Sequence, residues 1–311
     1  MEQKKDTLLE IHNLSVSFKM YDNGLKQSDL KVISDLHLTV HPGEIVAIAG
    51  SSGSGKSLLA AAILGILPEN ASLQGHIHYK GEELTDERMR QLRGTEIALV
   101  PQSVSYLNPL MKVGSQVEGH NVPQASEKRK RLFERLNLAE RTAKLYPFQL
   151  SGGMARRVLV STALITDAQL IIADEPTPGM SIEQALEALK MFREMADEGK
   201  AVILITHDID LAVEFADRVA VFYAGTTVET ALASDFKAGE GALRHPYSKA
   251  LWRALPQNGF EPIPGFQPYA GNLPKGCLFA PRCPYRTPEC EVQVPPVCEV
   301  RGGEVRCYHG T

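Results

Sequence analysis

Residues 44–57 read Glu-Ile-Val-Ala-Ile-Ala-Gly-Ser-Ser-Gly-Ser-Gly-Lys-Ser, and this stretch decides the fold. An apolar run typical of a strand ends in a glycine-rich loop, and the apolar residues 58–67 that follow indicate a buried helix. The pattern G-x-x-x-x-G-K-S in this context predicts a phosphate-binding loop, whose backbone N–H groups converge on phosphate oxygens. We expect the lysine to reach the β- and γ-phosphates and the last serine to ligate Mg²⁺. The predicted nucleotide-binding residues of this P-loop are Gly50, Ser51, Ser52, Gly53, Ser54, Gly55, Lys56 and Ser57.

The sequence outside the P-loop predicts an α/β fold. Residues 8–18 alternate between apolar and polar side chains, as a half-buried strand does. Residues 167–173 and 201–206 are short and almost wholly apolar, which is typical of parallel strands buried on both faces. Between them, apolar residues from Ile182 to Met195 recur at helical spacing. Strand, helix and strand in succession predict a mainly parallel core sheet.

Two adjacent carboxylates follow one of these apolar runs. Residues 170–175 read Leu-Ile-Ile-Ala-Asp-Glu, so Asp174 and Glu175 lie at a predicted strand end, where α/β sheets bind ligands. A P-loop enzyme needs an acidic metal partner, and we expect Asp174 to hold Mg²⁺ while Glu175 polarises an attacking water. Because successive strand residues point in different directions, the two carboxylates can take separate roles.

Composition excludes several classes of protein. The chain has 311 residues, 43% hydrophobic and 23% charged, which excludes collagen-like and largely disordered proteins. A net charge of −4 argues against a nucleic-acid partner, since such proteins normally carry a basic excess. The longest apolar run, 58–67, is shorter than the ~20 residues that span a bilayer. The basic N-terminus has no apolar segment behind it, so we expect no secretory signal and a cytosolic chain.

Further motifs give the sequence a family resemblance. Residues 150–154 read Leu-Ser-Gly-Gly-Met, Gln102 follows Val-Pro, and His207 lies in Ile-Thr-His-Asp. Together with the P-loop and the two carboxylates, these motifs resemble those of the ATP-binding cassette ATPases over roughly residues 8–256. The resemblance implies a cassette with antiparallel N-terminal strands and a helical insertion at about 103–160. Residues 109–147 agree, because they show charged helical character and no comparable strand.

The same resemblance assigns roles to individual residues. It implies that Gln102 joins Ser57 and Asp174 around Mg²⁺, and that Glu175, His207 and Gln102 are catalytic. Two cassettes are expected to pair head to tail, so the signature residues Ser151, Gly152 and Gly153 would act on the partner's ATP. Adenine is expected to stack on Phe18, with Tyr21 as the fallback.

Two positions depart from the family pattern. Met154 stands where the signature usually has Gln, although the peptide-importer branch tolerates Met. Ser181 stands where the family expects an Asp that couples the two nucleotide sites, so equal turnover at both sites is in doubt.

All five cysteines lie within residues 277–311, after a segment rich in proline and glycine. The set Cys277-x₅-Cys283-x₆-Cys290-x₁₆-Cys307 favours metal over disulfides in a cytosolic protein. Zinc sites usually have C-x₂₋₄-C pairs, which are missing here, whereas iron–sulfur clusters tolerate wider spacing. Free thiols in a loop-rich tail are the remaining alternative. The sequence therefore predicts a cassette at 1–256 and a C-terminal extension at 257–311.

The tail resembles the C-terminal extension of the dipeptide, oligopeptide and nickel importer ATPases. The resemblance rests on residues 245–251 (His-Pro-Tyr-Ser-Lys-Ala-Leu), 262–265 (Pro-Ile-Pro-Gly) and 276–284 (Gly-Cys-Leu-Phe-Ala-Pro-Arg-Cys-Pro). It implies a [4Fe–4S] cluster on Cys277, Cys283, Cys290 and Cys307, and leaves out Cys298.

The resemblance implies an ATP-hydrolysing importer subunit with ATP, Mg²⁺ and a [4Fe–4S] cluster, energising uptake of di- or oligopeptides. Nickel or a nickel chelate is the alternative cargo. The implied partners are a second, related ATPase subunit in a heterodimer, two transmembrane permeases and, indirectly, an extracytoplasmic substrate-binding protein. The expected location is the cytoplasmic face of the cell membrane. Two other classes stay open: a soluble cassette ATPase uncoupled from transport, and an iron–sulfur redox sensor, which conflicts with the intact ATPase motifs.

Overall fold

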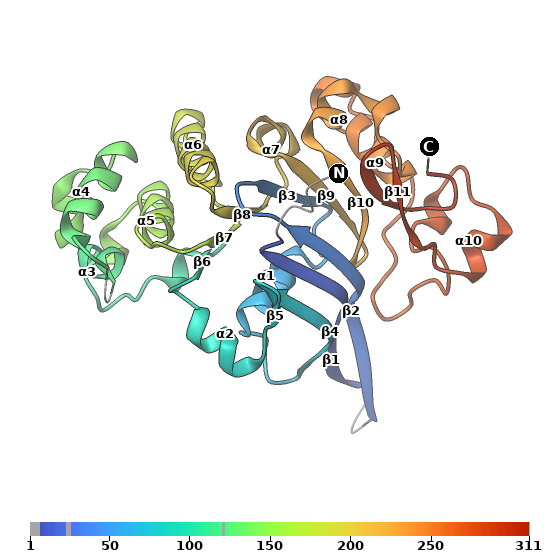
Figure 1. The fold of residues 1–311 in the computed structure, drawn as a ribbon, viewed down its shortest axis with the longest axis horizontal. Coiled ribbons are helices and arrows are strands. Elements are labelled where there is room, and N and C mark those ends of the chain that lie inside the picture. Colours follow the sequence, from blue (N-terminus) through green and yellow to red (C-terminus); the bar gives the residue numbers. More distant parts are fainter. Residues whose placement is uncertain (1–6, 23–25, 120–121, 311) are drawn as a thin grey trace. The chain divides into compact units, whose positions relative to one another are not determined.

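The computed structural model describes residues 7–22, 26–119 and 122–310, and the chain divides into two compact units. The first unit comprises residues 1–41, 46–86 and 207–311, and the second comprises 42–45 and 87–206. Figure 1 labels most of the helices and strands of both units.

The first unit contains an antiparallel sheet of four strands. In spatial order the strands are β2 (Lys26–Val40), β1 (Leu9–Asp22), β4 (Ala71–Tyr79) and β5 (Glu82–Glu83). Alternating apolar residues of β1, including Leu9 and Ile11, are buried. Leu9 lies opposite Val40 of β2 and Tyr79 of β4. The predicted N-terminal antiparallel strands are therefore confirmed, and β1 extends beyond the alternating segment to Asp22.

A second set of strands in the first unit carries the P-loop. Its neighbouring strands, in order, are β3 (Ile45–Gly50), β9 (Arg218–Tyr223), β10 (Thr226–Leu232), β12 (Gly303–Arg306) and β11 (Val297–Val300). β3 and β9 are parallel, and the remaining pairs are antiparallel. The hairpin β11–β12 belongs to the extension that the sequence predicts to be loop-rich. Each of its strands has only four residues, too short a run for alternation to stand out.

Helices complete the first unit. They are α1 (Lys56–Leu64), α7 (Ile209–Phe215), α8 (Ala233–Ala238), α9 (Pro246–Arg253) and α10 (Pro288–Val292), with short 3₁₀ turns at Glu240–Ala242, Pro256–Asn258 and Ala280–Arg282. The buried helix predicted after the P-loop is confirmed as α1. It begins two residues earlier than the apolar run and ends at Gly65, which takes a left-handed C-cap conformation.

The extension is tied to the sheet by Arg244, whose side chain is 1% exposed. Its guanidinium pairs with Glu229 at 3.3 Å and Asp235 at 2.8 Å. It also donates to the carbonyl oxygens of Val300 (2.5 Å) and Arg301 (2.6 Å) in the β11–β12 hairpin. A buried guanidinium needs such partners because an unpaired buried charge is strongly destabilising. Arg244 therefore holds α9, β10 and the hairpin together.

The second unit contains three parallel strands and its own helices. The strands are β6 (Ile97–Val100), β7 (Leu170–Asp174) and β8 (Ala201–Ile205), paired in that order. The helices of this unit include α2 (Asp86–Leu92), which starts at the unit boundary, and α6 (Ile182–Asp197). All residues of β7 and β8 are buried, as their apolar runs predict. The crossover helix between them is confirmed as α6.

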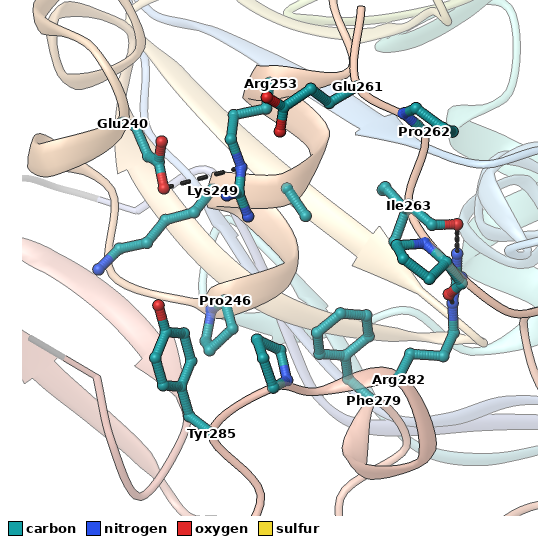
Figure 2. Close-up of a pocket in the computed structure, with 13 residues that line it drawn as sticks. Glu240, Pro246, Lys249, Arg253, Glu261, Pro262, Ile263, Phe279, Arg282 and Tyr285 are labelled. Atoms are coloured by element: carbon teal, nitrogen blue, oxygen red, sulfur yellow. Dashed lines mark hydrogen bonds and ion pairs between the residues drawn. The ribbon is translucent and has the colours of Figure 1, made fainter.

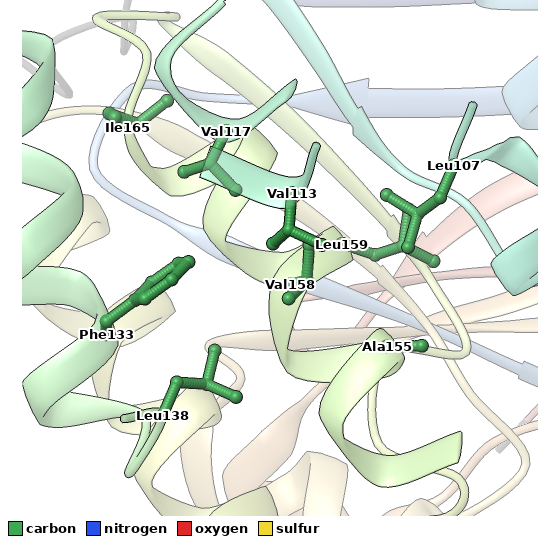
Figure 3. Packing of buried hydrophobic residues seen from close by; sticks show 9 residues of the cluster. All are labelled: Leu107, Val113, Val117, Phe133, Leu138, Ala155, Val158, Leu159 and Ile165. Atoms are coloured by element: carbon green, nitrogen blue, oxygen red, sulfur yellow. The ribbon is translucent and has the colours of Figure 1, made fainter. Parts of the chain in front are cut away.

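A helical subdomain with its own core occupies part of the second unit. It consists of α3 (Val113–Glu118), α4 (Ala125–Arg135), α5 (Gly152–Leu164) and 3₁₀ turns at Val104–Tyr106, Glu140–Lys144 and Pro147–Gln149. Figure 3 shows its buried core, to which Phe133 of α4, Val113 and Val117 of α3 and Val158 of α5 contribute. Among the described residues between 109 and 147 there is no strand, as the sequence predicts.

Candidate functional site

The P-loop runs from the end of β3 to the start of α1 and is held in a compact form. The backbone of Gly50 passes so close to the neighbouring strand that a Cβ there would lie 2.3 Å from the carbonyl oxygen of Phe222. Only glycine fits at this position. The ammonium of Lys56 folds back over the loop and donates to the carbonyl oxygens of Gly50 (2.9 Å) and Ser51 (3.0 Å). The loop thus holds the ammonium of Lys56 over its own backbone, and the contact of Lys56 with phosphate stays a prediction.

The side chains of the P-loop serines differ in exposure. Ser52 and Ser57 are exposed, so the Ser57 hydroxyl is accessible, and its role as a Mg²⁺ ligand stays a prediction. Ser54 is completely buried, and its backbone N–H donates to the carbonyl oxygen of Ser51 at 3.3 Å. A buried hydroxyl cannot reach a ligand in the loop. The side chain of Ser54 is therefore part of the packed interior, and only its backbone can contribute to phosphate binding.

The C-terminal extension contacts the P-loop, which the sequence did not predict. The Ser51 hydroxyl donates to Oε1 of Gln267 at 2.5 Å. The hydroxyl and backbone N–H of Ser51 also hydrogen-bond with the phenol oxygen of Tyr247 in α9. Burial raises the pKa of Tyr247, and the Ser51 hydrogen bonds partly offset that rise. No local sequence signal connects these residues, because 216 positions separate Ser51 from Gln267.

The other predicted nucleotide residues of the first unit lie on β1 and before α7. Phe18 is half-buried in β1, opposite Leu30 of β2 and Ala71 of β4. Tyr21 is 67% exposed, and its hydroxyl accepts a hydrogen bond from Gln27 at 3.1 Å. His207 is exposed and precedes Asp208, which caps α7. Both β1 aromatics therefore stay candidates for stacking on adenine.

In the second unit, Asp174 and Glu175 lie at the end of β7, and both are largely buried. Glu175 has a φ of 48°, a left-handed conformation that costs energy for a residue with a side chain. Its backbone N–H donates to the carbonyl oxygen of Ile205 at 2.9 Å, which fixes this turn. The two carboxylates are thus adjacent in sequence but differ in backbone conformation, as separate roles require.

Arg156 of α5 is a candidate positioning residue that the sequence did not reveal. Its side chain is buried, and Nη1 donates to the carbonyl oxygen of Pro101, next to the exposed Gln102. Burial lowers the pKa of Arg156, while the negative charges of Asp174 and Glu175 oppose that shift. Arg156 therefore links the start of the Gln102 loop to the charge of the two carboxylates.

The predicted signature residues form the N-terminus of α5. Ser151 caps the helix, and its hydroxyl accepts from the backbone N–H of Met154 at 3.3 Å. Gly153 packs so closely that a Cβ would lie 2.7 Å from the carbonyl oxygen of Gly179. Gly152 has open space around it. The start of α5 thus leaves backbone donors accessible at Gly152, while Gly153 fits against the loop before α6.

Ser181 has a clear structural role at the start of α6. Its hydroxyl accepts from the backbone N–H of Gln184 at 3.4 Å, and Oε1 of Gln184 accepts from the backbone N–H of Ser181 at 3.3 Å. This reciprocal pair is a capping box. Asp is an equally good N-cap residue, so the local structure is compatible with the family's residue at this position.

Four of the five cysteines form a group in the extension. The thiols of Cys277, Cys283 and Cys290 each raise the pKa of Cys307, which burial chiefly raises to about 11. Backbone N–H groups donate to three of the sulfurs: those of Phe279 and Ala280 to Cys277, that of Tyr285 to Cys283, and that of His309 to Cys307. Cys298 lies exposed on β11 outside this group.

The thiols of this group are not arranged as a metal site. N–H donors to sulfur are a means by which proteins stabilise cluster thiolates. Within the described part of the chain, however, no three His, Cys, Asp or Glu side chains converge as ligands of one metal ion. The arrangement of these side chains therefore does not support the [4Fe–4S] cluster that the sequence predicts, and the cluster stays a prediction.

The structure groups the predicted residues by unit. The P-loop, Phe18, Tyr21, His207 and the cysteines lie in the first unit, and Gln102, the signature residues, Asp174, Glu175 and Ser181 lie in the second. Across the described residues, no helix is both long and apolar enough to cross a membrane.

Comparison with known families gives two matches along the chain. The family described as "ABC transporter" matches residues 33–178. The family described as "Oligopeptide/dipeptide transporter, C-terminal region" matches residues 228–290. The first match includes the P-loop, the signature and both carboxylates, and the second includes α9 and three of the four grouped cysteines.

Individual proteins resemble nearly the whole chain. A peptide import ATP-binding protein of Brucella abortus is 38% identical, and the alignment covers 98% of this chain and 95% of the relative. The oligopeptide transport ATP-binding protein OppD of Salmonella typhimurium is 34% identical, with 98% and 95% covered. Among solved structures, a dimeric ATP-binding cassette in a post-hydrolysis state with ADP and Pi has a TM-score of 0.64 at 25% identity, covering 73% of this chain and 99% of that one.

Proposed function

Because the chain belongs to the ABC transporter family, in the group with the oligopeptide/dipeptide transporter C-terminal region, we propose that it energises uptake of di- or oligopeptides. The chain is an ATP-hydrolysing cassette, and its fold and motifs agree with that activity. The observation that carries the peptide assignment is the similarity to peptide-import proteins over almost the full length, extension included.

In the proposed reaction, the P-loop binds the phosphates of ATP and Lys56 exchanges its carbonyl partners for phosphate oxygens. When Mg²⁺ is bound, it neutralises charge on the phosphates, and Ser57, Gln102 and Asp174 are its proposed ligands. Glu175 takes a proton from the attacking water, and His207 assists at the γ-phosphate.

A second cassette completes each site in this proposal. Ser151, Gly152 and Gly153 would present backbone donors to the ATP of the partner, since a helix N-terminus attracts anions. The dimer of the similar cassette with ADP and Pi supports such a pairing. We propose that the second subunit is a related but different cassette, and that the pair binds two transmembrane permeases at the cytoplasmic face. A separate substrate-binding protein would deliver the peptide.

We also propose that Cys277, Cys283, Cys290 and Cys307 hold a [4Fe–4S] cluster. The N–H donors to their sulfurs support this assignment. Such a cluster would replace four neighbouring thiols, of which that of Cys290 is buried, by metal-bound thiolates and so stabilise the extension.

The cluster is tested by measuring iron, acid-labile sulfide and zinc in anaerobically purified protein. We expect about four irons per chain and a broad visible absorption band, both lost in Cys283→Ser. The matched control Cys298→Ser changes the exposed cysteine outside the group and should keep both. One zinc per chain, or no metal at all, would refute the cluster.

The transport assignment is tested in the organism that encodes the chain. Deletion of the gene should abolish uptake of labelled di- and oligopeptides and leave uptake of radioactive nickel unchanged. The wild-type gene should restore peptide uptake, whereas Lys56→Ala should not, because it removes the cation of the P-loop. Loss of nickel uptake with intact peptide uptake would contradict the peptide assignment.

A further inference from the structure

Ser51 is the P-loop residue at which contacts from inside and outside the loop meet. From inside, Lys56 donates to its carbonyl oxygen at 3.0 Å. From outside, Gln267 accepts from its hydroxyl at 2.5 Å, and Tyr247 hydrogen-bonds to its hydroxyl and backbone N–H. Both outside contacts come from residues C-terminal to β10, and Ser51 itself is exposed. These partners restrain Ser51 although it is exposed. The conformational entropy of this residue is therefore already lost when the protein folds, before any ligand binds.

The ring of Tyr247 is fixed by a buried aromatic cluster. Tyr247 is 2% exposed and packs on Tyr223 of β9, with ring centroids 4.5 Å apart. Phe279 packs against both rings, at 5.2 Å from Tyr223 and 5.4 Å from Tyr247. Phe279 lies between Cys277 and Cys283 in the sequence, so the aromatic cluster includes a residue of the cysteine-containing segment. The phenol of Tyr247 therefore has little freedom to move away from Ser51.

Gln267 is placed by a second route through the extension. Arg282 donates to the carbonyl oxygens of Pro264 (2.8 Å) and Ile263 (2.9 Å), just before Gln267. Figure 2 shows Arg282 beside Phe279, with its bond to Ile263. The guanidinium also lies over the rings of Tyr223 and Phe279, at about 6 Å from each centroid. Both outside contacts of Ser51 thus depend on the same packed part of the extension.

We propose that Tyr247 and Gln267 are positioning residues of the P-loop, through which the C-terminal extension sets the affinity of the site for nucleotide. The inference rests on the proposed binding of ATP at this loop. When Lys56 binds the phosphates, its hydrogen bond to the carbonyl oxygen of Ser51 is lost. The contacts of Ser51 with Tyr247 and Gln267 remain. A loop that is already held in its binding conformation loses less conformational entropy when nucleotide binds. This increases the affinity for nucleotide without changing the chemical step.

The test measures nucleotide affinity, turnover and melting temperature in matched variants of the full chain. The probe is a fluorescent ATP analogue with Mg²⁺, and ATPase assays give KM and kcat. Tyr247→Phe removes only a hydroxyl, and Gln267→Ala removes an amide from a partly exposed segment. We expect Gln267→Ala to raise Kd and KM about fivefold, the loss of one hydrogen bond, and Tyr247→Phe to raise them at least as much, because its phenol interacts with two groups of Ser51. The kcat and the nucleotide-free melting temperature should stay unchanged in both variants. Tyr285→Phe and Gln293→Ala, exposed in the same extension, are the controls and should change nothing.

A double-variant cycle adds a readout that general destabilisation would not give. Gln267 reaches the Ser51 hydroxyl, so Gln267→Ala should have no further effect in a Ser51→Ala background. Tyr247→Phe should keep part of its effect there, because the Ser51 backbone N–H remains.

Two outcomes would overturn the inference and leave the proposed function standing. One is an unchanged Kd in Tyr247→Phe, Gln267→Ala double variants while Lys56→Ala still abolishes binding. The other is a parallel fall in melting temperature, kcat and affinity in both single variants, which would indicate a structural role only. Equal ATP binding by wild type and Lys56→Ala would instead contradict the proposed function itself.

Discussion

Glu175 combines a costly backbone conformation with a carboxylate at the end of a buried strand. Such strain persists where the surrounding structure fixes it, and here the bond from its N–H to Ile205 does so. Because a strained turn separates its side chain from that of Asp174, the proposed metal-binding role of Asp174 and the proposed proton-accepting role of Glu175 can be tested one at a time.

Glu175→Gln is expected to lower the ATPase rate by about 100-fold or more, since an amide cannot accept the proton of the attacking water. ATP binding should persist, because the P-loop and Asp174 are intact, and ATP-bound dimers should accumulate. Single-turnover ATPase assays and size-exclusion chromatography with Mg-ATP measure both effects. Glu183→Gln, an exposed acid at the start of α6, is the matched control. Unaltered turnover in Glu175→Gln would show that another group is the general base.

At the scale of single residues, fixed spacing made the P-loop and both carboxylates predictable. Arg156 was not, because an isolated Arg has no sequence pattern that distinguishes it from a surface residue. Tyr247 lies in the motif at 245–251, but that motif does not reveal its contact with the P-loop. Their importance comes from partners far away in the chain: Pro101 for the first and Ser51 for the second.

Among the elements, α6 shows how a departure from a family pattern can be neutral for the fold. Ser181 and Gln184 form its capping box. Ser181→Ala should lower the free energy of unfolding by about 1 kcal/mol, because a backbone N–H of the first turn loses its acceptor. Ser181→Asp should leave it unchanged, since Asp caps equally well. Urea denaturation of the three proteins checks this, and equal stability of the alanine variant would show that the cap contributes nothing.

Other elements were predictable to different degrees. The buried strands β7 and β8 were clear from their apolar runs, and α1 from its place after the P-loop. The hairpin β11–β12 was not, because its strands are short, mostly exposed and surrounded by Gly, Pro and Cys. Its pairing depends on β10 and Arg244 rather than on local preference.

For the whole molecule, stability should depend on pH through His245. This histidine is completely buried, and burial lowers its pKa from 6.5 to about 3. Its Nδ1 accepts from the backbone N–H of Tyr247, and the backbone N–H of His245 donates to Oε2 of Glu229. The unfolded chain binds a proton below pH 6.5 that the folded chain binds only near pH 3. Stability is therefore full above pH 6.5 and falls as the pH is lowered toward 3, by up to about 1.4 kcal/mol per unit.

The measurement is urea denaturation at pH 7.5, 6 and 5. His245→Asn keeps a side-chain acceptor at the N-cap of α9 but cannot titrate, so its stability should fall less between pH 6 and pH 5 than that of the wild type. Identical pH profiles would show that His245 is not the responsible group.

The position of β11 and β12 in the sheet also governs when the protein can finish folding during synthesis. Both strands are translated after every other strand of the described chain, yet they cover the edge of β10, two strands away from β3, which leads into the P-loop. Until the ribosome has released residues 297–306, β10 presents an unpaired edge, and such edges invite pairing with other chains. Prematurely terminated chains should therefore aggregate, although they contain every nucleotide-binding motif.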